Sequence, residues 1–166
     1  MYLVYFVVDQ LAMGIEIERK FMVEGDGWKT AAGDGLACRQ GYLATDPEKT
    51  VRVRIIGEQA FLTIKGATSG ISRSEFEYGI PVADATELLK LCGDAVVEKT
   101  RYSITHGGMV WELDVFSGAN EGLVMAEIEL ESEAQPFDLP DWAGQEVSGA
   151  PRYYNASLAH HSFSTW

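Results

Sequence analysis

The sequence predicts a mainly β (α+β) protein of one domain, built from eight antiparallel strands with a few flanking helices. Three observations predict this fold class. The chain has 166 residues, of which 46% are hydrophobic, so it is long enough to bury one sizeable core. Apolar and polar residues alternate through most of its length, which indicates strands with two different faces. Glycine-containing pairs separate neighbouring stretches at hairpin spacing.

Eight stretches carry the alternation. They lie near residues 14–23, 37–44, 50–56, 60–65, 72–80, 97–105, 109–117 and 122–131. Gly57-Glu58 predicts a two-residue hairpin between the third and fourth stretches, and Gly107-Gly108 predicts one between the sixth and seventh. Such short connections require antiparallel neighbours.

One helix interrupts the strands. Asp84 is placed to cap its first turn with Glu87 reaching back, and Gly93 suits its C-terminal end. The tail after Pro136 is rich in proline and glycine, so we expect it to be irregular until a short helix at 155–161.

The first thirteen residues (MYLVYFVVDQLAM) are apolar, but they lack a basic start and a cleavage site, and they are too short to span a bilayer. Because Met13 offers a second start, residues 1–13 are either an N-terminal extension or a misassigned start, and residues 14–166 form the domain. Cys38 and Cys92 are far apart, which suits a reducing, cytoplasmic location. The net charge of −12 disfavours nucleic-acid binding, and no membrane partner is expected.

Charge gathers on one parity of the strands. This parity holds Glu16, Glu18, Lys20, Arg52, Arg54, Thr63, Lys65, Arg73, Glu75, Glu77, Lys99, Arg101, Glu112, Asp114, Glu127 and Glu129. With Arg39 added, it holds eight of the 13 basic residues. Carboxylates two residues apart on a strand point the same way at roughly 7 Å, within reach of a hard cation. Paired arginines can each bind a phosphate. On spacing alone, a solvated outer face and an inward-facing tunnel remain equally good interpretations.

The opening block Gly14-Ile-Glu-Ile-Glu-Arg-Lys-Phe21 resembles the Glu-x-Glu-x-Lys motif of the CYTH domain superfamily, the triphosphate tunnel metalloenzymes. Further blocks follow in the order of that family, at residues 38–43, 51–54, 62–65, 72–77, 98–102, 111–116, 126–129 and 152–155. The resemblance implies an eight-stranded antiparallel closed β-barrel with the charged parity inside. It also implies a triphosphate substrate and a requirement for Mg²⁺ or Mn²⁺.

The resemblance implies a role for each charged residue of the parity. The catalytic set is Glu16, Glu18, Lys20, Lys65, Glu75 and Glu77. The residues expected to hold the phosphate chain are Lys20, Arg39, Arg52, Arg54, Lys65, Arg73, Lys99 and Arg101. The expected metal ligands are Glu16, Glu18, Glu112, Asp114, Glu127 and Glu129. For Arg73, an ion pair with Glu75 or Glu112 is an equally good interpretation, and Glu75, Glu77, Glu112 and Asp114 could each serve only to pair with a cation.

The short bacterial members, which hydrolyse inorganic tripolyphosphate, are the best match. The expected reaction is attack of a metal-activated water on a terminal phosphorus, with a carboxylate accepting the proton. Alternatives are a class IV adenylate cyclase, a nucleoside or thiamine triphosphatase, and a noncatalytic polyphosphate-binding module. Trp28, Tyr42 and Tyr153 are candidates to stack a base. The apolar outer parity suits a homodimer.

Overall fold

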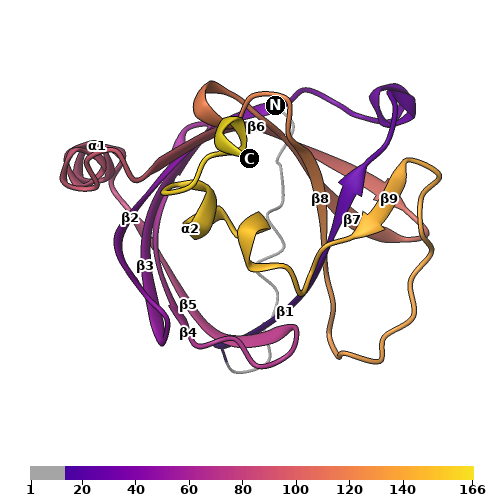
Figure 1. Cartoon of the computed structure of the whole chain (residues 1–166), viewed down its shortest axis with the longest axis horizontal. Helices are drawn as coiled ribbons and strands as arrows, with labels where there is room; N and C mark the ends of the chain where they lie inside the picture. Colours follow the sequence, from indigo (N-terminus) through magenta and orange to yellow (C-terminus); the bar gives the residue numbers. More distant parts are fainter. Residues whose placement is uncertain (1–13) are drawn as a thin grey trace.

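The computed structural model describes residues 14–166, and strands dominate it (Figure 1). The strands are β1 (Ile15–Val23), β2 (Leu36–Asp46), β3 (Lys49–Ile56), β4 (Gln59–Gly66), β5 (Ser72–Ile80), β6 (Val96–His106), β7 (Met109–Phe116), β8 (Val124–Glu129) and β9 (Ala143–Glu146). Eight of them match the predicted stretches within a few residues. The short β9 lies in the tail that was expected to be irregular. The N-terminal extension predicted for residues 1–13 lies outside the described residues.

The eight predicted strands close into a ring. They follow one another in the order β5-β4-β3-β2-β6-β7-β8-β1, and β1 pairs with β5 to complete the barrel. This closing seam is short, because β1 meets β5 only over Ile15–Ile17, and β9 pairs farther along β1, at Phe21 and Val23. The predicted closed antiparallel barrel is therefore confirmed.

Glycine conformation explains the two predicted hairpins. Gly57 follows β3 with a φ of 54°, while Gly107 and Gly108 join β6 to β7 with φ values of 58° and 77°. Two residues at positive φ give the turn whose twist matches that of antiparallel strands, and glycine adopts this conformation without a steric penalty. Both hairpins fall where the sequence predicted them.

The helix α1 (Val82–Leu91) ends as predicted but begins earlier. Gly93 follows its C-cap with a φ of 59°, the left-handed conformation common at helix ends. Its N-cap is Pro81, and no side chain caps the first turn, so the predicted capping by Asp84 is wrong. The fixed φ of proline suits a helix start, and Asp84 lies inside the first turn, where its charge favours the helix dipole.

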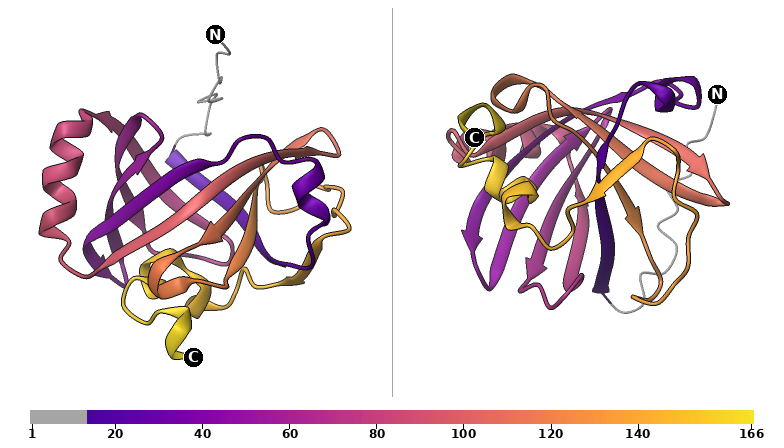
Figure 2. Two further views of the ribbon diagram at one scale, coloured as in Figure 1. Left: turned by 90° about the horizontal axis from the view of Figure 1, so that it is seen from above. Right: turned by 45° about the vertical axis from the view of Figure 1, so that its right-hand side comes forward.

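The outward parity of the barrel is largely apolar and packs against segments outside the barrel, and Figure 2 shows α1 on one side of it. The wall from β6 to β1 packs Trp111, Leu113 and Ile128 against Trp142 and against Trp28 of η2 (Gly27–Thr30). On the opposite wall, α1 packs on β2, β3 and β4. These two hydrophobic clusters therefore lie outside the barrel, and the middle of its interior is left to polar side chains. No helix among residues 14–166 is long and apolar enough to cross a membrane.

The C-terminal segment packs into one end of the barrel. It comprises η4 (Pro151–Tyr153), α2 (Asn155–Leu158) and η5 (Phe163–Thr165), and Figure 1 shows α2 across the opening. Tyr153 and Leu158 pack against Phe116 and Met125, which share the inward parity. The predicted helix at 155–161 therefore exists, but it ends at Leu158.

Shortening Leu158 to alanine should destabilise the whole fold. The side chain is 1% exposed and packs in the cluster that closes the barrel end. Loss of a buried leucine side chain typically lowers the free energy of unfolding by about 2–5 kcal/mol. Urea denaturation would measure this loss. The matched control is Leu139→Ala, because Leu139 is 51% exposed and its truncation should change stability little. Equal stability of the two variants would contradict the packing described here.

Candidate active site

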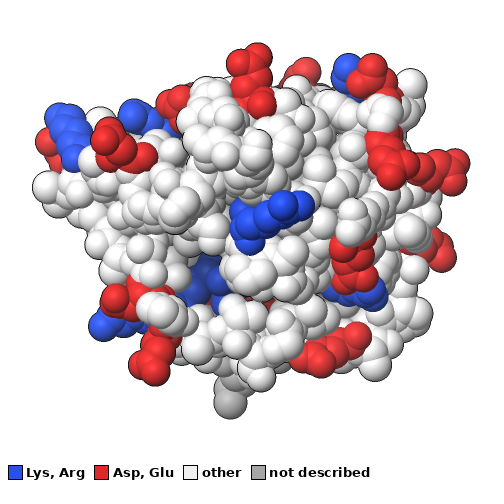
Figure 3. Space-filling view, in the orientation of Figure 1, with Lys and Arg blue, Asp and Glu red and all other residues white. Residues whose placement is uncertain are grey.

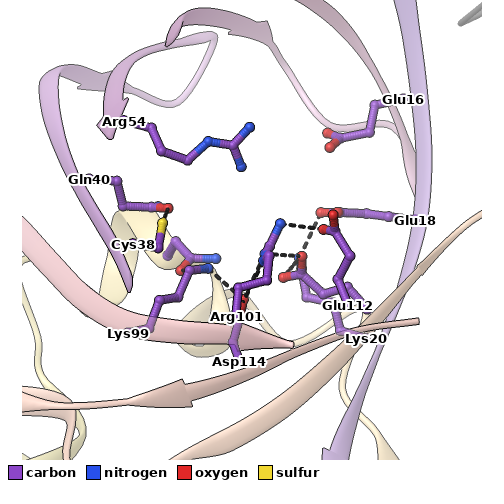
Figure 4. A network of polar contacts seen from close by, with 12 residues as sticks. Glu16, Glu18, Lys20, Cys38, Gln40, Arg54, Lys99, Arg101, Glu112 and Asp114 are labelled. Carbon is purple, nitrogen blue, oxygen red and sulfur yellow. Dashed lines mark hydrogen bonds and ion pairs between the residues drawn. The ribbon is translucent and has the colours of Figure 1, made fainter. Parts of the chain in front are cut away.

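The charged parity faces the interior of the barrel (Figure 4). Buried polar residues on that parity come from all eight ring strands except β5, whose inward charges are partly buried. The buried charged residues lining the interior are Glu16, Lys20, Arg52, Arg54, Lys65, Lys99, Arg101, Asp114 and Glu127. The solvated-face interpretation of the alternation is therefore wrong, and the tunnel interpretation is correct.

Lys20 joins two acidic strands. Its Nζ lies 2.7 Å from Oε1 of Glu18 and 2.7 Å from Oε1 of Glu127. Burial alone would lower the pKa of Lys20, but the carboxylates of Glu127 and Glu18 outweigh this effect and raise it. The same contacts, with Arg101, hold the pKa of Glu127 well below its usual value despite burial. Lys20 is therefore a fixed positive charge between two carboxylates.

Arg101 and Lys99 share the carboxylate of Asp114. Nε and Nη2 of Arg101 donate to the two oxygens of Asp114 at 2.8 and 2.7 Å, and Nζ of Lys99 donates to Oδ2 at 2.5 Å. Arg101 also pairs with Glu112 and Glu127. Lys99 donates at 3.2 Å to Oδ1 of Asn155 in α2, which ties the C-terminal segment to the tunnel wall.

Glu16 anchors the seam between β1 and β5. Lys65 Nζ donates to both of its carboxylate oxygens at 2.9 Å, and Arg73 Nε donates to Oε2 at 2.8 Å. Lys65 also lies 2.8 Å from Oε2 of Glu75. Arg73 pairs with Glu16 and, at 3.5 Å, with Glu18, so it does form ion pairs inside the barrel, as the alternative interpretation held, but with carboxylates other than Glu75 or Glu112.

Two arginines of β3 converge on one carboxylate. Nη2 of Arg52 and of Arg54 each lie 3.2 Å from Oε2 of Glu77, and the buried hydroxyl of Thr63 donates to the same oxygen at 2.7 Å. Arg52 also donates to that hydroxyl at 3.1 Å. The Nε atoms of Arg52 and Arg54 are buried and have no hydrogen-bond partner among residues 14–166. Buried donors without a partner are rare, so an acceptor for these two atoms is expected beyond the described residues.

Glu129 has a different environment from the other tunnel carboxylates. No lysine or arginine among residues 14–166 forms an ion pair with Glu129, whose side chain is accessible to solvent. Partial desolvation, together with the carboxylates of Glu16, Glu75 and Glu112, raises the pKa of Glu129 to about 7. Excess negative charge is therefore concentrated near Glu129. A cation bound there would relieve it.

The structure corrects the placement of Arg39. Its side chain is 57% exposed and lies 3.4 Å from Glu98 on the outside of the barrel. Gly41, two residues farther on, lies directly under Leu89 and Cys92 of α1, so this parity of β2 points outward. The tunnel instead receives Cys38, Gln40 and Tyr42, which are buried; Gln40 Nε2 donates to Tyr42 Oη at 2.8 Å. Sequence reasoning missed Cys38 and Gln40, and considered Tyr42 only for base stacking, because it followed charge and β2 contributes neutral groups.

The structure also locates the three aromatic residues that were candidates for base stacking. Trp28 packs on Tyr102 outside the barrel, with ring centroids 5.0 Å apart, and Tyr153 belongs to the segment that closes the barrel end. Tyr42 lines the tunnel, but burial and its bond with Gln40 fix its hydroxyl. All three rings are buried, so none offers an exposed face for a nucleobase.

Figure 3 shows acidic side chains spread around the periphery of the end covered by the C-terminal segment.

Fold and site together define a closed β-barrel whose tunnel sets a carboxylate wall against lysines and arginines. The model of the CYTH domain family matches residues 14–162. The chain therefore belongs to the CYTH domain family.

Several relatives cover nearly the whole chain. An inorganic triphosphatase of Acetivibrio thermocellus is 50% identical over 155 residues, which is 93% of this chain and 99% of the relative. An inorganic triphosphatase of Nitrosomonas europaea is 41% identical over 150 residues, 87% of this chain and 96% of the relative. A crystal structure of an inorganic triphosphatase, 38% identical, has a TM-score of 0.62 and covers 87% of this chain and 93% of its own.

Proposed function

We propose that this protein hydrolyses inorganic tripolyphosphate to pyrophosphate and phosphate with the help of Mg²⁺ or Mn²⁺. The observation that carries the proposal is the tunnel itself, in which buried arginines with unpartnered donors face a wall of carboxylates. The relatives named inorganic triphosphatase, at 41–50% identity, support the same reaction.

The basic residues suit a short, highly charged phosphate chain. Arg52 and Arg54 lie on the inward parity of β3 with unsatisfied Nε donors among the described residues, and Lys65 lies on the neighbouring strand β4. Planar guanidinium groups bind phosphate oxygens in pairs, and desolvated cations stabilise charge that develops on a departing phosphate. Lys99, Arg101 and Lys20 extend the cationic surface around the ring to β1. Arg39 has no part in this proposal because it lies outside.

The carboxylates divide into two groups by their contacts. Asp114 and Glu127 are buried and saturated by lysine and arginine, so we assign them to orienting these cations. Glu129 pairs with no cation among residues 14–166, and the nearby carboxylates of Glu16, Glu112 and Glu18 leave excess negative charge around it although each of them also pairs with a cation. Oxygen donors of this kind fit Mg²⁺ or Mn²⁺, and we propose that they hold it.

The tunnel residues have different roles in the proposed hydrolysis. A bound divalent cation supplies Lewis-acid charge and lowers the pKa of water. The arginines of β3 and the lysines orient the phosphate chain and neutralise the leaving pyrophosphate. A tunnel carboxylate accepts the proton of the attacking water. Without substrate the cations bond to carboxylates, so binding exchanges those ion pairs for contacts with phosphate.

Thr63 should affect substrate binding through the two arginines. Its hydroxyl links Arg52 to Glu77, and valine has the same shape without that hydroxyl. We expect Thr63→Val to raise the KM for tripolyphosphate about tenfold, because hydrogen bonds to charged groups contribute about 1.5–3 kcal/mol. Initial-rate kinetics would show this. Thr63→Ser keeps the hydroxyl and should restore the wild-type KM; failure of serine to do so would contradict the role given to that group.

A substrate panel tests the proposed reaction. Tripolyphosphate, pyrophosphate, ATP and thiamine triphosphate are supplied with Mg²⁺ or Mn²⁺, and phosphate and cyclic nucleotide are measured. We expect fast release of phosphate from tripolyphosphate and loss of activity with EDTA. Hydrolysis of ATP with none of tripolyphosphate would contradict the proposal, and binding of tripolyphosphate without turnover would indicate a noncatalytic module.

A further inference from the structure

Arg152 is the one lysine or arginine among residues 14–166 that forms no ion pair with another described residue. Each of the others pairs with an aspartate or a glutamate, either inside the barrel or on its surface. Arg152 is exposed, and no other lysine or arginine follows Arg101 in the sequence. In a chain with a net charge of −12, Arg152 is therefore an exposed positive charge that no carboxylate of the described side chains neutralises.

Two aromatic rings hold the guanidinium group of Arg152. Its Cζ lies 4.9 Å from the ring centre of Tyr153 and 4.6 Å from that of Trp166. These two rings meet edge to face with their centroids 5.1 Å apart, and Arg152 Nη2 donates to Tyr153 Oη at 3.0 Å. Contact with a ring covers a face of the guanidinium but leaves N–H donors in its plane, and this edge binds phosphate oxygens in pairs. The charge is held in place without being neutralised.

Arg152 lies at the barrel end that the C-terminal segment covers. It belongs to η4, which leads into α2 across the opening (Figure 1). Three residues later, Asn155 accepts a hydrogen bond from Lys99 of the tunnel at 3.2 Å, so the segment that carries Arg152 is joined to the tunnel cations.

The apolar cluster that closes this barrel end lies on one side of it. Its buried strand residues come from β6, β7 and β8, and none comes from β3, β4 or β5. The cluster therefore leaves unfilled the side next to β3, the strand that carries Arg52 and Arg54. Figure 3 shows this end with a basic group near its middle, further basic groups recessed in a hollow beside it, and acidic groups around the periphery.

We propose that Arg152 binds the outer phosphate of tripolyphosphate at this end of the tunnel. The inference rests on the proposed function, in which the arginines of β3 bind the phosphates that lie deeper. Exposed charges more than about 8–10 Å away are largely screened at physiological ionic strength, so the acidic periphery repels the substrate less than a cation at the opening attracts it. A cation in that position raises the local concentration of an anionic substrate. Arg152 thus extends the cationic path of the tunnel to its opening.

Initial-rate kinetics at several ionic strengths test this role. We expect Arg152→Gln to lower kcat/KM for tripolyphosphate about tenfold, to leave kcat within about twofold, and to weaken the salt dependence of kcat/KM, because charges at the rim of a site act on binding. Arg152→Lys keeps the charge and should recover most of the loss. The matched control is Lys90→Gln, which makes the same change in net charge at an exposed residue of α1 and should behave as the wild type. An unchanged kcat/KM in Arg152→Gln, or an equal loss in Lys90→Gln, would overturn the proposal.

Isothermal titration calorimetry with tripolyphosphate in EDTA separates this role from the reaction. We expect the Kd of Arg152→Gln to be about tenfold higher than that of the wild type, with thermal unfolding showing that both are folded. Equal Kd values would overturn the role of Arg152. A wild type that binds tripolyphosphate but does not hydrolyse it when Mg²⁺ is restored would contradict the proposed function alone, and a wild type that binds none would contradict both.

Discussion

Replacing Lys20 by alanine is expected to lower the rate of tripolyphosphate hydrolysis at least about a hundredfold. The ammonium group is buried and joins Glu18 to Glu127, so its removal leaves two carboxylates facing each other without a counter-charge. It also removes a cation from the proposed phosphate path. Loss of one positioned group that stabilises developing charge commonly lowers kcat by this amount. Phosphate release at saturating Mg²⁺ measures the effect.

The control for Lys20 is Lys29→Ala. Lys29 is exposed and pairs with Asp26 outside the barrel, so its loss should leave turnover unchanged. If Lys20→Ala folds and turns over at the wild-type rate, Lys20 has no part in the reaction.

Glu16→Gln should have an effect of similar size for a different reason. The variant keeps the shape of the side chain but loses the charge that holds Lys65 and Arg73 in place. One of the proposed metal ligands loses its charge as well. We expect turnover to fall at least about a hundredfold. The concentration of Mn²⁺ needed for half-maximal rate should rise, which distinguishes this variant from Lys20→Ala.

The matched substitution is Glu121→Gln, in an exposed turn before β8. It should alter neither turnover nor the requirement for Mn²⁺. Near-normal activity of Glu16→Gln with saturating metal would remove Glu16 from the site.

The sequence predicted most of the barrel because strand periodicity and glycine turns are local properties. Closure could not be derived from them, since an inward and an outward charged face have the same alternation. The resemblance to the family indicated that the charged face points inward. The ion pair of Glu16 with Arg73 across the β1–β5 seam agrees with a closed barrel. These two residues are far apart in the sequence, and only closure brings them together.

Two features of the site were not settled by prediction. Arg39 was placed inside because it is basic, whereas the direction of β2 is set by Gly41 packing under α1, a tertiary contact with no local signal. Closure of one barrel end by Tyr153, Asn155 and Leu158 was only one of two equally good interpretations of Tyr153 and Asn155, the other being direct contact with the substrate. That segment has neither strand periodicity nor a long helical periodicity. Its position in the barrel end depends on tertiary packing, which a local sequence pattern does not predict.

The central claim is that the phosphate chain lies inside the barrel between the acidic and basic walls. A crystal structure of the protein soaked with tripolyphosphate in the presence of EDTA tests it directly. We predict phosphate density in the tunnel, with oxygens within hydrogen-bond distance of the Nε atoms of Arg52 and Arg54. Tripolyphosphate bound on the outer surface, with the ion pairs of the tunnel unchanged, would contradict the account.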